Sequence, residues 1–172
     1  TSSRTITLTV NQPPTVTFSS PAAVCSNTAA FVLTTGSPAG GTYSGTGVSG
    51  NTFNPSTAGV GTTNLTYNYT DAGGCSGSAN SSIVVNAIPT VTLSTFNSIC
   101  QSASLLTLTG GSPAGGTYSG TGVSSGKFNA ANAGAGTHTI TYSYTNGSGC
   151  TNTATSTITV NPTPTVTLAA LA

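Results

Sequence analysis

Four cysteines are the side chains most able to do chemistry in this chain of 172 residues. Cys25 and Cys75 stand 50 residues apart, and Cys100 and Cys150 repeat that spacing. A zinc site usually takes four ligands at short spacings, which single cysteines separated in this way do not supply. An even number of cysteines in a charge-poor chain indicates disulfides made outside the cytosol. We therefore predict that all four cysteines form disulfides and that none binds a metal.

The charged side chains are too few for most catalysis or ion binding. Arg4, Lys127 and Asp71 are the charged residues, and they give a net charge of +1. A calcium loop needs several oxygen ligands, and paired-carboxylate catalysis needs a second acid. A surface that binds nucleic acid needs clustered cations. The sequence therefore predicts no enzyme activity, no metal or cofactor, and no binding of nucleic acid.

Two features that resemble functional motifs have simpler explanations. His138 is the one histidine, and a Ser/His/Asp triad would have to recruit Asp71 from a distant part of the chain, so we predict a solvent-facing strand residue. Residues 45–50 spell GxGxxG, but no helical pattern follows and no acid stands about 20 residues further on. We interpret these glycines as turn residues.

Tyrosines offer one candidate for ligand binding. Tyr43 and Tyr118 stand in the same local sequence, GGTYSGTG, and could stack on sugars as tyrosines do in carbohydrate-binding β-sandwiches. Packing within a strand pair is the commoner role for tyrosine in such runs. Sugar binding at these two residues is therefore an alternative to a purely structural role.

The sequence is an internal repeat with a period of 75 residues. A shift by that length places Cys25 on Cys100 and Cys75 on Cys150, with no gap. The stretch Gly36–Ser49 recurs unchanged as Gly111–Ser124. Self-similarity at a fixed period is the signature of tandem arrays. The chain therefore contains two copies of one unit, which we name module 1 (12–86) and module 2 (87–161).

Both ends of the chain continue the repeat. Residues 1–11 contain TITLTVN, which matches the end of module 2, so we predict the last strand of a preceding module. Residues 162–172 contain PTVTL, which matches the start of each module, so we predict the first strand of a following module. The sequence is thus interpreted as a window on a longer array.

Each module carries the pattern of short strands separated by turns. Apolar and polar residues alternate in Leu65–Tyr69, which predicts a strand with one buried face. Seven strands per module fit an immunoglobulin-like (Ig-like) antiparallel β-sandwich. The predicted strands are Thr15–Phe18, Phe31–Thr35, Gly41–Ser44, a hairpin of two strands between Val48 and Phe53, Thr62–Tyr69 and Ser78–Val85.

Several linked motifs identify a type of repeat. They are PTVTL, a cysteine before the second strand, GGTYSGTGV, a phenylalanine followed by an AG turn (Phe53 to Gly59), and an aromatic strand that ends in GC. Together they resemble the Ig-like or PKD-like tandem repeats of large Bacteroidota cell-surface proteins, which are gliding-associated and type IX-secreted. Members of that group commonly carry an acidic turn, TDANGC; here Asp71 in module 1 is replaced by Asn146 in module 2. The resemblance implies an extracellular adhesin, stalk or fibre.

The pairing of the four cysteines has two solutions from the sequence. The internal one joins Cys25 with Cys75 and Cys100 with Cys150, and staples each small core. If seven strands alternate in direction, however, Cys25 and Cys75 lie a strand length apart, about 17–20 Å, where a disulfide needs Cα atoms within about 7 Å. Cys25 would then pair with Cys150 across the joint between modules. We favour the internal pairs slightly, because small domains often use that solution.

We therefore predict a non-catalytic structural segment of an extracellular fibre, filament or adhesin stalk. Its expected partners are neighbouring copies of the same repeat protein, because a surface with almost no net charge favours self-association. The alternatives are a module that binds surface polysaccharide and a passive spacer of a secreted enzyme. No run of 18 apolar residues is present, so we expect no membrane insertion of this segment.

Overall fold

The protein folds into two compact units built almost entirely of β-strands. The computed structural model describes residues 3–7 and 10–167. The chain divides into the units Thr1–Ala87 and Ile88–Ala172. Eighteen strands and two single-turn helices make up the regular structure of the described residues. The all-β fold class predicted from the sequence is confirmed.

The two units follow the same order of elements. In the first unit these are β1 (Thr17–Phe18), β2 (Val24–Cys25), β3 (Phe31–Val32), β4 (Gly36–Ser37), β5 (Thr42–Gly45), β6 (Val48–Ser49), β7 (Thr52–Phe53), α1 (Pro55–Ala58), β8 (Gly61–Thr70) and β9 (Ser76–Asn86). In the second they are β10 (Thr92–Leu93), β11 (Ile99–Cys100), β12 (Leu106–Thr107), β13 (Gly111–Ser112), β14 (Thr117–Ser119), β15 (Val123–Ser124), β16 (Lys127–Phe128), α2 (Ala130–Ala133), β17 (Gly136–Thr145) and β18 (Thr151–Asn161).

Each unit is a sandwich of one larger sheet and two smaller ones. The first unit has a four-stranded sheet in the order β2-β9-β8-β5, a three-stranded sheet β3-β7-β6 and the pair β1-β4. The second unit has the corresponding sheets β11-β18-β17-β14, β12-β16-β15 and β10-β13. Buried side chains from all three sheets meet in one core per unit. No helix in the described residues has the length and apolar character needed to cross a bilayer.

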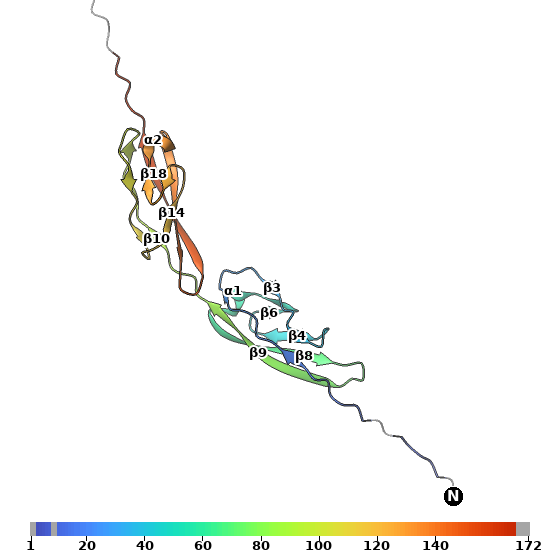
Figure 1. Cartoon of the computed structure of the whole chain (residues 1–172). Helices are drawn as coiled ribbons and strands as arrows, with labels where there is room; N and C mark the ends of the chain where they lie inside the picture. The colour runs from blue at the N-terminus through green and yellow to red at the C-terminus, as the bar shows by residue number, and fades with distance from the viewer. Residues whose placement is uncertain (1–2, 8–9, 168–172) are drawn as a thin grey trace, which may run out of the picture. The chain divides into compact units, whose positions relative to one another are not determined.

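The longest element of each unit is a two-stranded antiparallel ribbon. β8 and β9 pair from Gly61 opposite Val85 to Thr70 opposite Ser76, and they run side by side in Figure 1. Alternate residues of the ribbon face the core, among them the fully buried Leu65 and Ile83. This alternation follows from the two-residue period of a strand, and the sequence pattern predicted it.

A buried tyrosine hydroxyl holds the loop that the two modules share without change. The Tyr67 hydroxyl donates to the Pro38 carbonyl oxygen at 2.5 Å and accepts from the Gly41 N–H at 2.7 Å. The loop lies so close to the ring that a Cβ at Gly36 would stand 2.6 Å from it. Tyr142 makes the same two bonds in the second unit. The invariance of this stretch therefore has a physical reason: glycines let the loop enclose the tyrosine.

The predicted strand count is corrected by very short strands. Each unit has nine strand segments where seven were predicted, because pairs such as β1 with β4 contain only two residues each. The additional β2 also pairs parallel to β9, with Val24 opposite Val85, so the sandwich is not wholly antiparallel. A run of two residues gives no periodic signal in the sequence. The predicted Val48–Phe53 hairpin is confirmed as β6 and β7.

The strands predicted for the two terminal segments are not formed in the described residues. Residues 3–7, 10–11 and 162–167 lie outside any strand, and residues 1–2, 8–9 and 168–172 lie outside the described part of the chain. A strand needs a hydrogen-bonding partner, and β18, which has the matching sequence pattern, is paired with β17 over its length. The described terminal residues have no such ladder.

Replacing Tyr67 by phenylalanine tests the role of the hydroxyl. Tyr67→Phe keeps the ring but leaves the Gly41 N–H and the Pro38 carbonyl without this partner. We expect the free energy of unfolding to fall by about 1–3 kcal/mol. Urea denaturation followed by circular dichroism measures it. Tyr69→Phe, on the half-exposed neighbour, is the control and should change it by under about 0.5 kcal/mol; equal losses in both would contradict the role.

Candidate functional site

Cys25 and Cys100 lie where the chain leaves each module. Cys25 ends β2 and stands opposite Asn86, the last residue of β9. The Ser26 N–H donates to the Asn86 carbonyl at 2.9 Å, which extends the pairing by one bond. In the second unit Cys100 stands opposite Asn161 in the same parallel pairing. The parallel strand thus fixes one cysteine beside the chain exit of each module.

Cys75 and Cys150 lie in the turn at the other end of the long ribbon. The Asp71 side-chain oxygen Oδ1 accepts from the Cys75 N–H at 2.9 Å, and the Asp71 N–H donates to the Cys75 carbonyl at 3.0 Å. Asn146 makes the same two bonds with Cys150, at 3.0 and 2.9 Å. An amide oxygen serves as well as a carboxylate, so this turn is closed by a side-chain acceptor in both modules.

The segment that enters each module runs along this cysteine turn. In the second unit the Asn152 side-chain amide donates to the Pro89 carbonyl at 2.9 Å. In the first unit a Cβ built at Gly77 would meet the Pro14 carbonyl oxygen at 2.9 Å, which shows how closely the incoming chain approaches β9. Each module therefore carries one cysteine at its incoming end and one at its outgoing end.

The internal disulfide pairs favoured from the sequence are wrong. Cys75 precedes β9 and Cys25 pairs beside its last residue; this strand has 11 residues, which at about 3.3 Å each span roughly 33 Å. A disulfide needs Cα atoms within about 7 Å. Cys75 and Cys100 are free thiols, and Cys25 and Cys150 are disulfide-bonded. Neither Cys25–Cys75 nor Cys100–Cys150 is formed, because the ribbon holds the two cysteines of a module apart.

Equivalent cysteines differ in exposure as well as in bonding. Cys150 is fully buried, whereas its counterpart Cys75 is half-exposed. Cys25 is half-buried, whereas its counterpart Cys100 is exposed. At both positions of the repeat the bonded cysteine is the less exposed one. The difference arises at positions with the same backbone pairing, so it does not come from the fold of the module itself.

His138 is not the solvent-facing residue predicted from the sequence. It is half-buried in β17, on the same face as the buried Ile140. Its Nε2–H donates to the Gly134 carbonyl at 2.9 Å, and its ring centroid lies 6.1 Å from that of Phe128. Its counterpart Thr63 is also buried. The error came from treating a polar residue as outward-facing against the alternation of its strand.

Tyr43 and Tyr118 pack mainly within their own modules. The Tyr43 ring centroid lies 4.6 Å from that of Tyr67, and its hydroxyl accepts from the Gly36 N–H at 2.8 Å. Tyr118 makes the corresponding contacts, at 4.7 Å to Tyr142 and with the Gly111 N–H. A surface hollow adjoins each of them, about 260 Å³ beside Tyr43 and about 400 Å³ beside Tyr118. Sugar stacking at these tyrosines stays a prediction.

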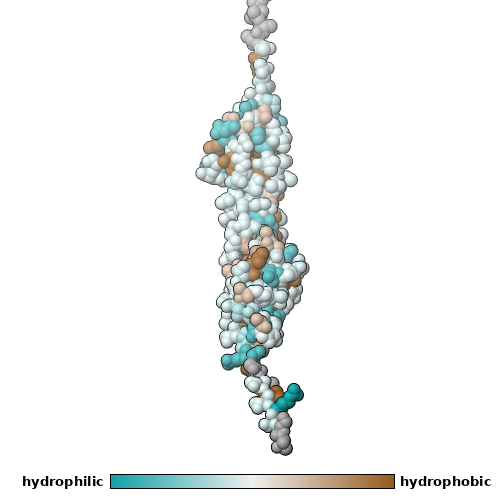
Figure 2. All heavy atoms as spheres, turned by 90° about the vertical axis from the view of Figure 1, so that its right-hand side faces the viewer, coloured by the Kyte–Doolittle hydropathy of each residue, from teal (hydrophilic) through white to brown (hydrophobic). Residues whose placement is uncertain are grey.

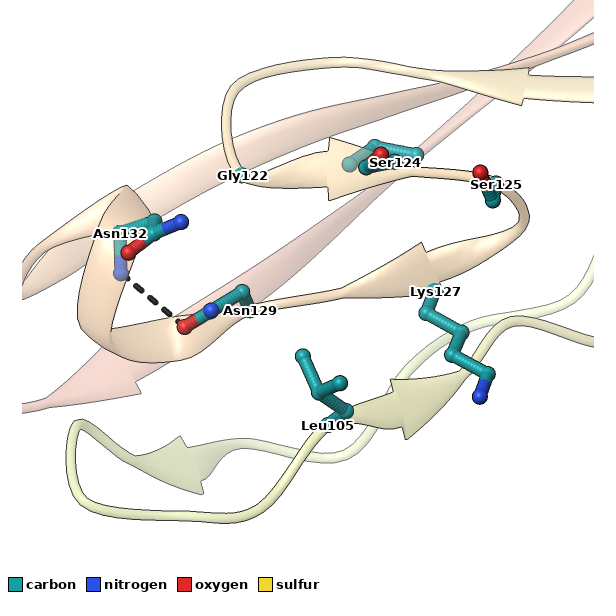
Figure 3. Close-up of a pocket in the computed structure, with 8 residues that line it drawn as sticks. Leu105, Gly122, Ser124, Ser125, Lys127, Asn129 and Asn132 are labelled. Carbon is teal, nitrogen blue, oxygen red and sulfur yellow. Dashed lines mark hydrogen bonds between the residues drawn. The ribbon is translucent and has the colours of Figure 1, made fainter.

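A larger hollow of about 500 Å³ lies in the second unit but has little chemistry (Figure 3). It is lined by Leu105, the β15–β16 hairpin and Lys127, with Asn129 and Asn132 at one side. Asn132 N–H donates to the Asn129 side-chain oxygen at 3.1 Å, so this oxygen caps α2. Module 1 has Ala30 in place of Leu105 and Thr52 in place of Lys127. The hollow is therefore particular to one copy.

The described residues hold no group of three or more histidine, cysteine or acidic side chains that could bind a metal ion. Asp71, the single acid, is used in its turn as described above. The positions with chemistry that recurs in both modules are thus the cysteines at the two ends, and they form the candidate functional site.

Comparison with known proteins gives a structural likeness and no family. No family model matches the chain, and no curated protein matches it. Among solved structures, one match is a "Ca2+-stabilized adhesin" that "helps an Antarctic bacterium reach out and bind ice". The identity is 18% and the TM-score 0.41, over 88% of this chain and 50% of that chain. A likeness at this level carries no argument about function, and this chain spans half the length of that one.

Replacing Asp71 tests the role of the acid in the cysteine turn. Asp71→Asn should change the free energy of unfolding by under about 0.5 kcal/mol, because Asn146 already performs the same role. Asp71→Ala should lower it by about 0.5–1.5 kcal/mol, since the Cys75 N–H loses its acceptor. Urea denaturation measures both. Added Ca²⁺ should leave the melting temperature of the original chain unchanged; a rise that Asp71→Asn abolishes would instead assign the acid to ion binding.

Proposed function

We propose that the chain is a non-catalytic structural segment of an extracellular fibre or adhesin stalk, in which Ig-like modules are joined end to end. The observation that carries the proposal is the placement of one cysteine at the incoming end and one at the outgoing end of each module. Cysteines so placed cannot staple their own core, because the ribbon separates them. They are suited to linking one module to the next.

The short connection between the modules supports a disulfide between Cys25 and Cys150. From Asn86 to Pro89 the chain advances three residues, which span at most about 11 Å. Cys25 stands opposite Asn86, and Asn152, two residues after Cys150, holds Pro89. Connectivity alone therefore keeps the two bonded cysteines in the same neighbourhood. We assign the pairing Cys25–Cys150 on this ground.

A second covalent link changes the mechanics of the joint. Domains connected by one peptide strand usually move relative to each other. A disulfide beside the peptide connection gives two attachments and removes most of that freedom. The connection itself is Asn86-Ala87-Ile88-Pro89, which lacks a flexible Gly/Ser tract. Restricted joints repeated along an array produce the stiffness that a stalk or fibre needs.

Three further observations favour an extracellular, self-associating segment. Disulfides persist in oxidising compartments. The repeat motifs resemble those of Bacteroidota cell-surface proteins, as described above. The face in Figure 2 is mostly pale, with scattered hydrophobic and hydrophilic residues, as a chain with 2% charged residues would give. Low charge favours contacts with neighbouring copies of the same protein, which we propose as its partners.

Polysaccharide binding is the second candidate function. The observation that favours it is the hollow beside Tyr43 and Tyr118 in both modules. Its polar lining is not shared, since Asn51 in the first hollow is replaced by Gly126 in the second. Affinity electrophoresis in gels that contain surface polysaccharide distinguishes the two functions: retardation of the chain would favour binding, and unchanged mobility would favour the structural role. A passive spacer within a secreted enzyme remains compatible with the structural role.

Disulfide mapping tests the proposed joint. After expression in an oxidising compartment and alkylation of free thiols, proteolysis without reduction should give one linked pair of peptides, with Cys25 and Cys150. Cys75 and Cys100 should carry the alkyl label. Cys25→Ser and Cys150→Ser should each abolish the link, whereas Cys75→Ser should leave it intact. A linked pair made of Cys25 and Cys75 would overturn the proposed joint.

Reduction then tests the mechanical consequence. We expect the distribution of distances between spin labels, one on each module, to broaden when the disulfide is reduced. The far-ultraviolet circular dichroism should stay unchanged, because no disulfide lies within a module core. Cys25→Ser should show the broad distribution both before and after reduction. A distribution that does not respond to reduction would contradict the stiffening role.

A further inference from the structure

The two free thiols stand at positions that are bonded in the other module. Cys75 is the counterpart of the bonded Cys150, and Cys100 is the counterpart of the bonded Cys25. Their backbone settings are alike: Cys75 is held by Asp71 as Cys150 is by Asn146, and Cys100 pairs with Asn161 as Cys25 does with Asn86. Each free thiol is thus already in the geometry in which its counterpart forms a disulfide.

Both free thiols also lie beside the ends of the two-module segment. The turn of Cys75 adjoins the incoming chain, since Gly77 lies against Pro14. Cys100 stands beside Asn161, after which the chain leaves module 2. A surface hollow of about 320 Å³ adjoins Cys75, lined by the paired ends of β8 and β9 from Asn68 to Ser78. The surface next to this thiol therefore has room for a neighbouring group.

We propose that Cys75 and Cys100 are attachment thiols for one further copy of the module on each side. Cys75 would bond the outgoing-end cysteine of a preceding copy, and Cys100 the incoming-end cysteine of a following copy. This inference rests on the proposed joint between Cys25 and Cys150. It extends that joint into a rule: each module is bonded through both of its cysteines, and never to itself.

The exposures of the four cysteines agree with this rule. The bonded cysteine is the less exposed one at each repeat position, with Cys150 buried and Cys75 half-exposed. Cys100, exposed at the outgoing end, is accessible to a partner thiol. A second copy of the same module supplies that partner with the same spacing and the same turn. The partner is therefore identified as a further module of this repeat.

The bond-forming step needs an electron acceptor, which we take to be a disulfide. Two cysteine thiols lose two protons and two electrons and form one S–S bond. A disulfide-carrying oxidant, such as oxidised glutathione or a thiol oxidase, loses its own S–S bond and becomes two thiols. The exchange proceeds by attack of one thiolate on the oxidant and then of the second thiol on the mixed disulfide.

A three-module chain tests the proposal. A second copy of residues 87–161 is inserted directly after Asn161, and the protein is made in an oxidising compartment. Two of its six cysteines should then be alkylated, namely Cys75 and the inserted counterpart of Cys100. Peptide mapping should find Cys100 linked to the inserted counterpart of Cys150. Alkylation of Cys100 in this chain, or its linkage to a second chain, would overturn the proposal.

Matched variants keep the result interpretable. Serine in place of the inserted counterpart of Cys150 should return Cys100 to the alkylated fraction, while the Cys25–Cys150 link persists. A second chain, with a copy of residues 12–86 inserted after Asn11, should protect Cys75 in the same way. Circular dichroism reports whether the inserted modules fold. If Cys25–Cys150 forms but Cys100 stays alkylated in a folded chain, the proposal fails alone; if Cys25–Cys150 is absent, the proposed joint fails too.

Discussion

The long antiparallel ladder between β8 and β9 is the constraint on which the rest of each module depends. Its ten residue pairs hold one face against the core and keep the two ends of the module about 30 Å apart. The cysteine turn closes the ladder at one end, and β2 joins it at the other. Because the ladder is rigid and covers the length of the module, the two cysteines cannot meet. The direction of their bonding follows from this separation.

The second constraint is the enclosed tyrosine, which explains where the two modules agree. The loop around Tyr67 must pass within contact distance of an aromatic ring, and only glycine leaves enough room at Gly36 and Gly41. The same requirement holds around Tyr142. Outside this loop the core accepts exchanges of similar shape, such as Leu65 in one module and Ile140 in the other. Packing thus fixes the loop sequence more tightly than it fixes the sheets.

The sequence predicted the features that have a period or a turn signal. The long strands, the β6–β7 hairpin and the all-β class were accessible, because alternation and glycine-rich turns carry them. The parallel β2 was not, since two residues have no period and their pairing depends on Val85 and Asn86, about 60 residues further on. The separation of Cys25 from Cys75 did follow from counting strands. The internal pairing was nevertheless preferred, on the general habit of small domains, and the length of the ribbon overrides that habit.

The spacing of the cysteines also limits how far a linked array can be stretched. Along the peptide alone, each repeat would release 75 residues of slack if its module unfolded. With every module bonded at both ends, tension passes between Cys25 and Cys75, and the covalent path per repeat shortens to 50 residues. At about 3.3–3.6 Å per residue, the contour length falls by roughly a third. The disulfides would then act as strain limiters, which preserve the continuity of the strand even after individual modules have melted.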